Sequence, residues 1–134
     1  MKIFLAYKFG GEDLQELTET LGKILAVLRS KGHTVYCSIE DEQSFQENKK
    51  TKLEILQHAF GKLDESDLIL AFVRSSEKSE GMLLEIGYML AKGKPLALAL
   101  QQGVKTNFIQ ELANPLIKFE SVDDLYEKLQ NINF

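Results

Sequence analysis

The chain has 134 residues, of which 44% are hydrophobic and 27% charged, and its formal net charge at pH 7 is -4. This composition is typical of a folded globular protein and excludes a disordered or fibrous chain. Because the 20 acidic and 16 basic residues are spread along the chain, there is no basic stripe and we expect no binding of nucleic acid.

The single cysteine and the lengths of the apolar runs indicate the cellular compartment that we expect for the protein. Cys37 lies in an apolar run, so we expect a buried and inert thiol. One cysteine allows no disulfide within the chain, which fits a reducing compartment. The N-terminal apolar run is too short for a signal peptide, and no run approaches the roughly 20 residues of a membrane span. We therefore expect a cytoplasmic protein that does not contact membranes.

Short apolar runs alternate along the chain with segments of helical periodicity. Residues 13–31 show the helical pattern best, since apolar side chains recur at steps of three and four and Gly32 follows as a stop signal. The polar segment 40–50 has no period and is predicted to be a loop. In chain order the pattern predicts a strand at 2–7, a helix at 13–31, a strand at 33–39, a helix at 51–63, a strand at 67–73, a helix at 82–92, a strand at 95–100, a short helix at 107–113, a strand at 116–119 and a helix at 122–132 opened by a Ser121 cap.

The fold class follows from the strands. Continuous apolarity in the run 67–73 indicates a strand buried on both faces, as in a parallel sheet. Right-handed crossovers then predict an α/β three-layer sandwich with a five-stranded parallel sheet, flavodoxin-like or Rossmann-like. No repeat or linker indicates a second domain, so residues 1–134 are expected to form one. Ligands of such sheets bind beyond the carboxyl ends of the strands, where the loops 7–13, 38–48 and 74–81 should meet.

Glu85 is the leading candidate for chemistry. It follows a buried strand-like run and a polar loop, near the start of the helix predicted at 82–92. Amide groups at a helix start favour the ionised form of an acid, so this carboxylate is a plausible nucleophile. The alternative is a charge that only stabilises the first turn of its helix.

Two glycines, Gly10 and Gly11, follow the first strand. They let the backbone approach a ligand closely and point amide groups at an anion, or they form a plain tight turn. The loop is neither a GxGxxG motif nor a phosphate loop ending in GK[ST], so the use of nucleoside triphosphates has no support.

Residues 79–95 read S-x-G-x-x-x-E-I-G-Y-x-x-A-x-G-K-P. This pattern resembles the signature of the nucleoside 2-deoxyribosyltransferase family and its relatives, the 2'-deoxynucleoside 5'-monophosphate N-hydrolases. The opening KIFLAYKFGGED is similar to the glycine-pair loop of the hydrolase branch, so the resemblance covers nearly the whole chain. It implies cleavage or transfer at the N-glycosidic bond of a nucleoside, a deoxynucleoside or a 5'-monophosphate.

The resemblance also implies roles for single residues. Glu85 matches the glutamate that attacks the anomeric carbon and forms a glycosyl-enzyme intermediate. Metal ions and redox cofactors are not part of this scheme, and relatives assemble as homodimers or larger homo-oligomers. The residues that the resemblance assigns to substrate binding are Tyr7, Gly10, Gly11, Ser79, Gly81 and Met82.

The chain departs from the family pattern at the second acid that assists the leaving base. Relatives carry this acid in the stretch that corresponds to 56–60 or to 72–76, and neither stretch holds a carboxylate here. His58 is an alternative proton donor, or else a surface or packing residue. Arg74 is a candidate for binding a phosphate, or an exposed arginine at a strand end. Leu83 stands where many relatives have a second glycine.

Two other functions remain open. The missing second acid fits a nucleotide-binding or signalling module without turnover. The run FLAY before an acidic helix start, with the spacing from Ser79 to Glu85, also resembles TIR-like domains, some of which cleave the nicotinamide bond of NAD with a glutamate. The tryptophan or cysteine usual before that glutamate is absent, since residues 82–84 read MLL, and this alternative ranks below the deoxyribosyl one.

Overall fold

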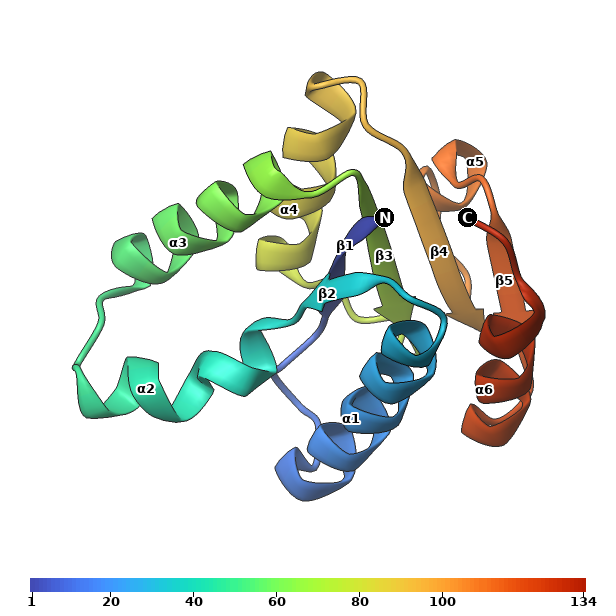
Figure 1. Ribbon diagram of the computed structural model, residues 1–134, viewed down its shortest axis with the longest axis horizontal. Coiled ribbons are helices and arrows are strands. Elements are labelled where there is room, and N and C mark those ends of the chain that lie inside the picture. Colours follow the sequence, from blue (N-terminus) through green and yellow to red (C-terminus); the bar gives the residue numbers. More distant parts are fainter.

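The computed structural model describes residues 1–134 and shows helices on both faces of a central sheet (Figure 1). All five strands are parallel and lie in the order β2-β1-β3-β4-β5. The predicted three-layer α/β sandwich with a five-stranded parallel sheet is confirmed. The strands are β1 (Lys2–Tyr7), β2 (Thr34–Tyr36), β3 (Leu68–Val73), β4 (Leu96–Gln101) and β5 (Leu116–Phe119).

The long helices each begin at a side chain that accepts a hydrogen bond from the first turn. Asp13, Thr51, Ser79 and Ser121 fill this position, and Thr51 forms a reciprocal pair with Glu54. Such caps satisfy amide groups that the helix itself leaves free. The helices are α1 (Leu14–Ser30), the 3-10 turn η1 (Ser38–Asp41), α2 (Glu42–Glu47), α3 (Lys52–Glu65), α4 (Glu80–Ala91), α5 (Ile109–Leu112) and α6 (Val122–Asn131).

The two faces of the sheet are covered by different helices. Leucines of α1 and α6 pack on one face, and side chains of α3 and α4 pack on the other. A strand covered on both faces buries every residue, which explains the uninterrupted apolar runs of β3 and β4. Cys37 is fully buried, and burial raises the pKa of its thiol to about 12, as expected of an inert cysteine.

The segment after the second strand differs from the prediction. The strand predicted at 33–39 shrinks to Thr34–Tyr36 at the edge of the sheet. The prediction of a loop at 40–50 was wrong, because η1 and α2 occupy most of this segment. Phe45 is the only buried residue of α2, so the sequence carries no apolar repeat that indicates a helix.

The order of the strands creates a crevice at the carboxyl end of β1. From β1 the chain turns to β2 on one side and later returns to β3 on the other, so the strand order reverses between β1 and β3. The ends of these strands are level, with Tyr7 paired to Phe72. Loops that leave such neighbours in opposite directions leave space for a ligand. None of the helices combines the length and the apolarity that crossing a membrane requires.

Candidate active site

A cavity of about 280 Å³ lies where the strand order reverses, and we call it the switch-point cavity. Its size is close to the lower end of the range of small-molecule sites in proteins. Its walls come from the end of β1 and from η1, α2, α3 and α4. The lining residues are Phe4, Leu5, Ala6, Tyr7, Phe9, Ser38, Glu42, Ile55, Ser79, Gly81, Met82 and Glu85.

Glu85 lines this cavity from the second turn of α4 and is partly buried. Burial raises the pKa of its carboxyl group from the usual 4.5 to about 7, and no neighbouring cation offsets this effect. The expectation that helix-end amides keep Glu85 ionised was wrong. The helix begins at Glu80, two residues before the predicted start, so Glu85 lies beyond the free amide groups of the first turn.

Tyr7 ends β1 and lines the same cavity. The hydroxyl group of Ser38 donates a hydrogen bond to the Tyr7 hydroxyl oxygen over 3.1 Å. Burial is the main reason why the pKa of Tyr7 is raised, and the charges of Glu42 and Glu85 raise it further. The phenol therefore stays protonated at neutral pH and keeps a proton to donate.

The start of α4 forms another wall of the cavity. Ser79 caps the helix, and its hydroxyl oxygen accepts a hydrogen bond from the Met82 amide over 3.3 Å. A Cβ atom added at Gly81 would meet no atom within 4 Å, so the backbone there is open towards the cavity. Met82 is buried and joins this wall to the core between the sheet and α4. The structure thus brings Tyr7, Ser79, Gly81, Met82 and Glu85 together around one cavity.

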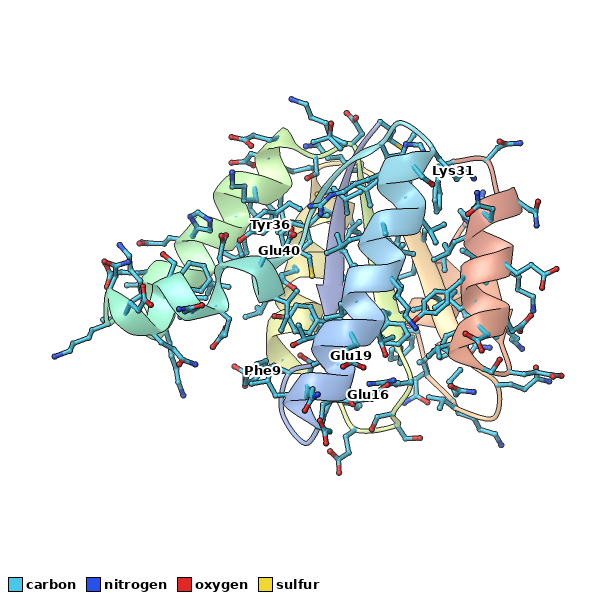
Figure 2. The ribbon with its side chains drawn as sticks, turned by 60° about the horizontal axis from the view of Figure 1, so that its bottom comes forward. Phe9, Glu16, Glu19, Lys31, Tyr36 and Glu40 are labelled. Carbon is cyan, nitrogen blue, oxygen red and sulfur yellow. The ribbon has the colours of Figure 1, made fainter.

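Gly10 and Gly11 do not line the switch-point cavity. Gly11 has a φ of +78°, and a Cβ atom there would lie 3.2 Å from Lys8 Nζ, which forms an ion pair with Glu77. A residue with a side chain is therefore strained at this turn. The neighbouring Phe9 lines the cavity instead, and Figure 2 shows it at the same end of the molecule as Glu16 of α1.

Arg74 is held by Glu12 of the β1–α1 connection and by Glu16 in the first turn of α1. Its Nη2 lies 2.9 Å from Glu12 Oε2, and its Nη1 lies 2.9 Å from Glu16 Oε1. The guanidinium group lowers the pKa of Glu16, chiefly through these hydrogen bonds, and its own pKa is raised. Arg74 does not line the switch-point cavity. Its donors are directed at protein carboxylates, so the geometry favours a structural role over phosphate binding.

His58 also lies outside the cavity. Its side chain is 42% exposed on α3, and Nε2 lies 3.4 Å from Asp41 Oδ2. The ring packs edge-on against Phe45, with 5.5 Å between centroids. These contacts join α3 to η1 and α2 and match the packing alternative for this histidine.

Seven residues that line the cavity were not named as site residues from the sequence, namely Phe4, Leu5, Ala6, Phe9, Ser38, Glu42 and Ile55. Glu42 lies in the segment 38–48 that was expected at the rim of the sheet, but it was not singled out because no helix was predicted there. One signal was present, since Glu42 and Gln46 stand four residues apart with Phe45 between them. The Gln46 amide donates to Glu42 Oε1 over 3.2 Å, as this spacing allows in a helix.

Comparison with known proteins supplies a family. The family model described as nucleoside 2-deoxyribosyltransferase matches residues 3–118. The solved structure of a CMP N-glycosidase from Clostridium botulinum has a TM-score of 0.74 and 19% identity, over 98% of this chain and 100% of that chain. A 2-deoxyribosyltransferase from Bacillus psychrosaccharolyticus has a TM-score of 0.70 and 22% identity, over 100% of this chain and 93% of that chain. No curated protein sequence matches the chain significantly. At these identities the solved structures confirm the fold.

Proposed function

The chain belongs to the nucleoside 2-deoxyribosyltransferase family, and we propose that it cleaves or transfers the N-glycosidic bond of a nucleoside or its 5'-monophosphate with Glu85 as nucleophile. The match over residues 3–118 includes both the glycine-pair loop and the segment that holds Glu85. The similar structures from C. botulinum and B. psychrosaccharolyticus are a CMP N-glycosidase and a 2-deoxyribosyltransferase, which supports this substrate class.

The observation that carries the proposal is the environment of Glu85. Its carboxyl group lines a ligand-sized cavity, and burial alone shifts its pKa to about 7. A carboxylate that has lost its water shell and has no cation partner is a better nucleophile than a solvated one. An acid with a perturbed pKa in a cleft is a candidate functional residue.

The reaction has two halves. The Glu85 carboxylate attacks the anomeric carbon, the bond from that carbon to the base nitrogen breaks, and a glycosyl ester forms on Glu85. Water then releases the free sugar, or a second base nitrogen takes the glycosyl group. We assign the sugar to the wall of Ser79, Gly81 and Tyr7, where a hydroxyl donor and open backbone lie beside the nucleophile.

We also propose a homodimer or larger homo-oligomer. Leu53 of α3 and Leu84 of α4 are 61% and 46% exposed, on helices that cover the same face of the sheet. Burying exposed leucines against a second copy is favourable. Analytical ultracentrifugation of the chain and of Leu84→Glu tests this assembly, and a monomeric parent chain would contradict it.

The experiment that tests the catalytic role is release of free base from a panel of nucleosides and 5'-monophosphates. Glu85→Ala and Glu85→Gln should abolish release while circular dichroism shows a folded protein. Glu80→Gln is the control, because Glu80 is exposed on the same helix and lies outside the cavity. Full activity of the Glu85 variants would contradict the proposal.

A second candidate is nucleotide binding without turnover. It is favoured by the lack of a carboxylate at 56–60 and 72–76 and by the position of His58 outside the cavity. Calorimetry that finds a nucleotide bound at the cavity, together with no base release over long incubation, would establish it. NAD belongs in the same panel, because release of nicotinamide would support the TIR-like alternative.

A further inference from the structure

Glu42 of α2 is a second carboxyl group in the switch-point cavity. We propose that Glu42 is a catalytic residue that gives a proton to the leaving base, a role that rests on the proposed function of Glu85. It would supply the acid that this chain lacks at 56–60 and 72–76.

The two carboxyl groups belong to residues that are far apart in the sequence and line the same cavity. Glu85 projects from α4 and Glu42 from α2, and both line the same 280 Å³ cavity. Both charges act on the Tyr7 hydroxyl group, after burial, to raise its pKa. The phenol of Tyr7 is therefore within electrostatic reach of each carboxyl group, and all three side chains line the cavity.

Glu42 is also held in place. The four other polar residues of α2 are exposed, whereas Glu42 is partly buried against the cavity. Phe45 anchors the helix by burying its ring, which packs against His58. The Gln46 amide donates to Glu42 Oε1 over 3.2 Å. A short helix fixed at one buried residue, with a hydrogen-bonded carboxyl group, can present an acid in a defined direction.

The chemistry requires such a group. When the glycosidic bond breaks, the electron pair stays on the base, and an unprotonated base is a poor leaving group. Protonation by a positioned acid contributes about 10²- to 10⁴-fold to the rate of such steps. Glycosidases commonly use two carboxyl groups, one as nucleophile and one as acid. Glu42 and Glu85 are the two carboxyl groups that line this cavity.

The proposed steps balance with Glu42 as the proton carrier and the Glu85 carboxylate as the nucleophile. Glu42 gives its proton to a nitrogen or oxygen of the base while the bond to the anomeric carbon breaks and the Glu85 carboxylate bonds to that carbon. Water then attacks the anomeric carbon, Glu42 takes the proton of water, and the bond to Glu85 breaks. The products are the protonated base and the free sugar, and both glutamates return to their initial states.

The test uses leaving groups that differ in their need for a proton. Glu42→Gln should lower base release from ordinary nucleosides and 5'-monophosphates by about 100-fold or more. Nucleosides of 7-methylguanine, whose base already carries a positive charge, and of 5-nitrouracil, whose anion is stable, should be cleaved within about threefold of the parent rate, since the acid step is not needed. Glu85→Gln should lose activity on both kinds of substrate.

Glu47→Gln is the control, because Glu47 is exposed on α2 and lies outside the cavity. Full activity of Glu42→Gln on ordinary substrates would overturn the role of Glu42. An equal loss on ordinary and activated substrates would also overturn it, since that result indicates binding or folding. Full activity of Glu85→Gln, by contrast, would overturn the proposed nucleophile. No base release by the parent chain would overturn both.

Discussion

Arg74 Nη2 lies 2.9 Å from Glu12 Oε2, which ties the end of β3 to the loop after β1. Both side chains are largely buried, at 16% and 17% exposure. A second pair, Lys8 with Glu77, joins the same two loops. The loops that flank the switch-point cavity are therefore connected by charge pairs rather than by backbone hydrogen bonds. This arrangement makes the position of each loop sensitive to single charge changes.

Arg74→Gln should destabilise the fold. It leaves the Glu12 carboxylate without its cation, and lost hydrogen bonds between charged groups cost about 1.5–3 kcal/mol. Thermal unfolding measures the loss. Arg29→Gln is the comparison, because the pair of Arg29 with Glu40 is more exposed and should cost about 1 kcal/mol or less. Unchanged stability with a specific loss of affinity for 5'-monophosphates would favour phosphate binding by Arg74 instead.

The rate should depend on the ionisation of Glu85. Burial places the pKa of this carboxyl group at about 7 in the free protein, and only the carboxylate is a nucleophile. The value of kcat/KM should therefore rise about tenfold per pH unit as the pH approaches 7 from below. A pH–rate profile of base release measures this limb, and Glu80→Gln should leave it in place. A rate that stays constant down to about pH 5 would contradict the assignment.

The Glu85 carboxyl group should lower the free energy of unfolding at alkaline pH. Its pKa is raised in the folded state, so the folded protein binds this proton more tightly than the unfolded chain does. The associated stability is present below about pH 4.5 and is lost as the pH rises through about 7. Glu85→Gln, which carries no charge, should therefore stabilise the protein at pH 8 by up to about 3 kcal/mol, and little at pH 4. Urea unfolding at both pH values measures the difference, and equal effects at the two pH values would contradict this account.

Gly81→Ala should separate stability from function. No atom lies within 4 Å of the added Cβ, and Gly81 has no positive φ, so alanine should stabilise α4 by about 0.4–1 kcal/mol. Because Gly81 lines the cavity, the same methyl group should also raise KM for base release. Gly87→Ala is the matched control, since Gly87 is exposed on α4 with equal space and does not line the cavity. Equal kinetics for the two variants would contradict a substrate site at Gly81.

The helices and strands along which buried positions recur could be predicted from the sequence. The strands β1, β3, β4 and β5 were found because buried positions recur along them, and helix α6 was found together with its Ser121 cap. Helix α2 was missed because Phe45 is its only buried residue, and one contact leaves no period in the sequence. The start of α4 was predicted two residues late, which changed the expected environment of Glu85.

The local pattern of residues was sufficient to predict the sheet, its rim of loops and the segment that carries Glu85. Periodic burial and helix capping depend on residues that are close together in the sequence. The surroundings of the site needed the folded chain. Arg74 and Glu12 stand 62 positions apart, and Glu42 reaches the cavity of Glu85 through a helix held by one side chain. Charge pairing and desolvation depend on such distant contacts, so the sequence showed neither the raised pKa of Glu85 nor the presence of Glu42 in the same cavity.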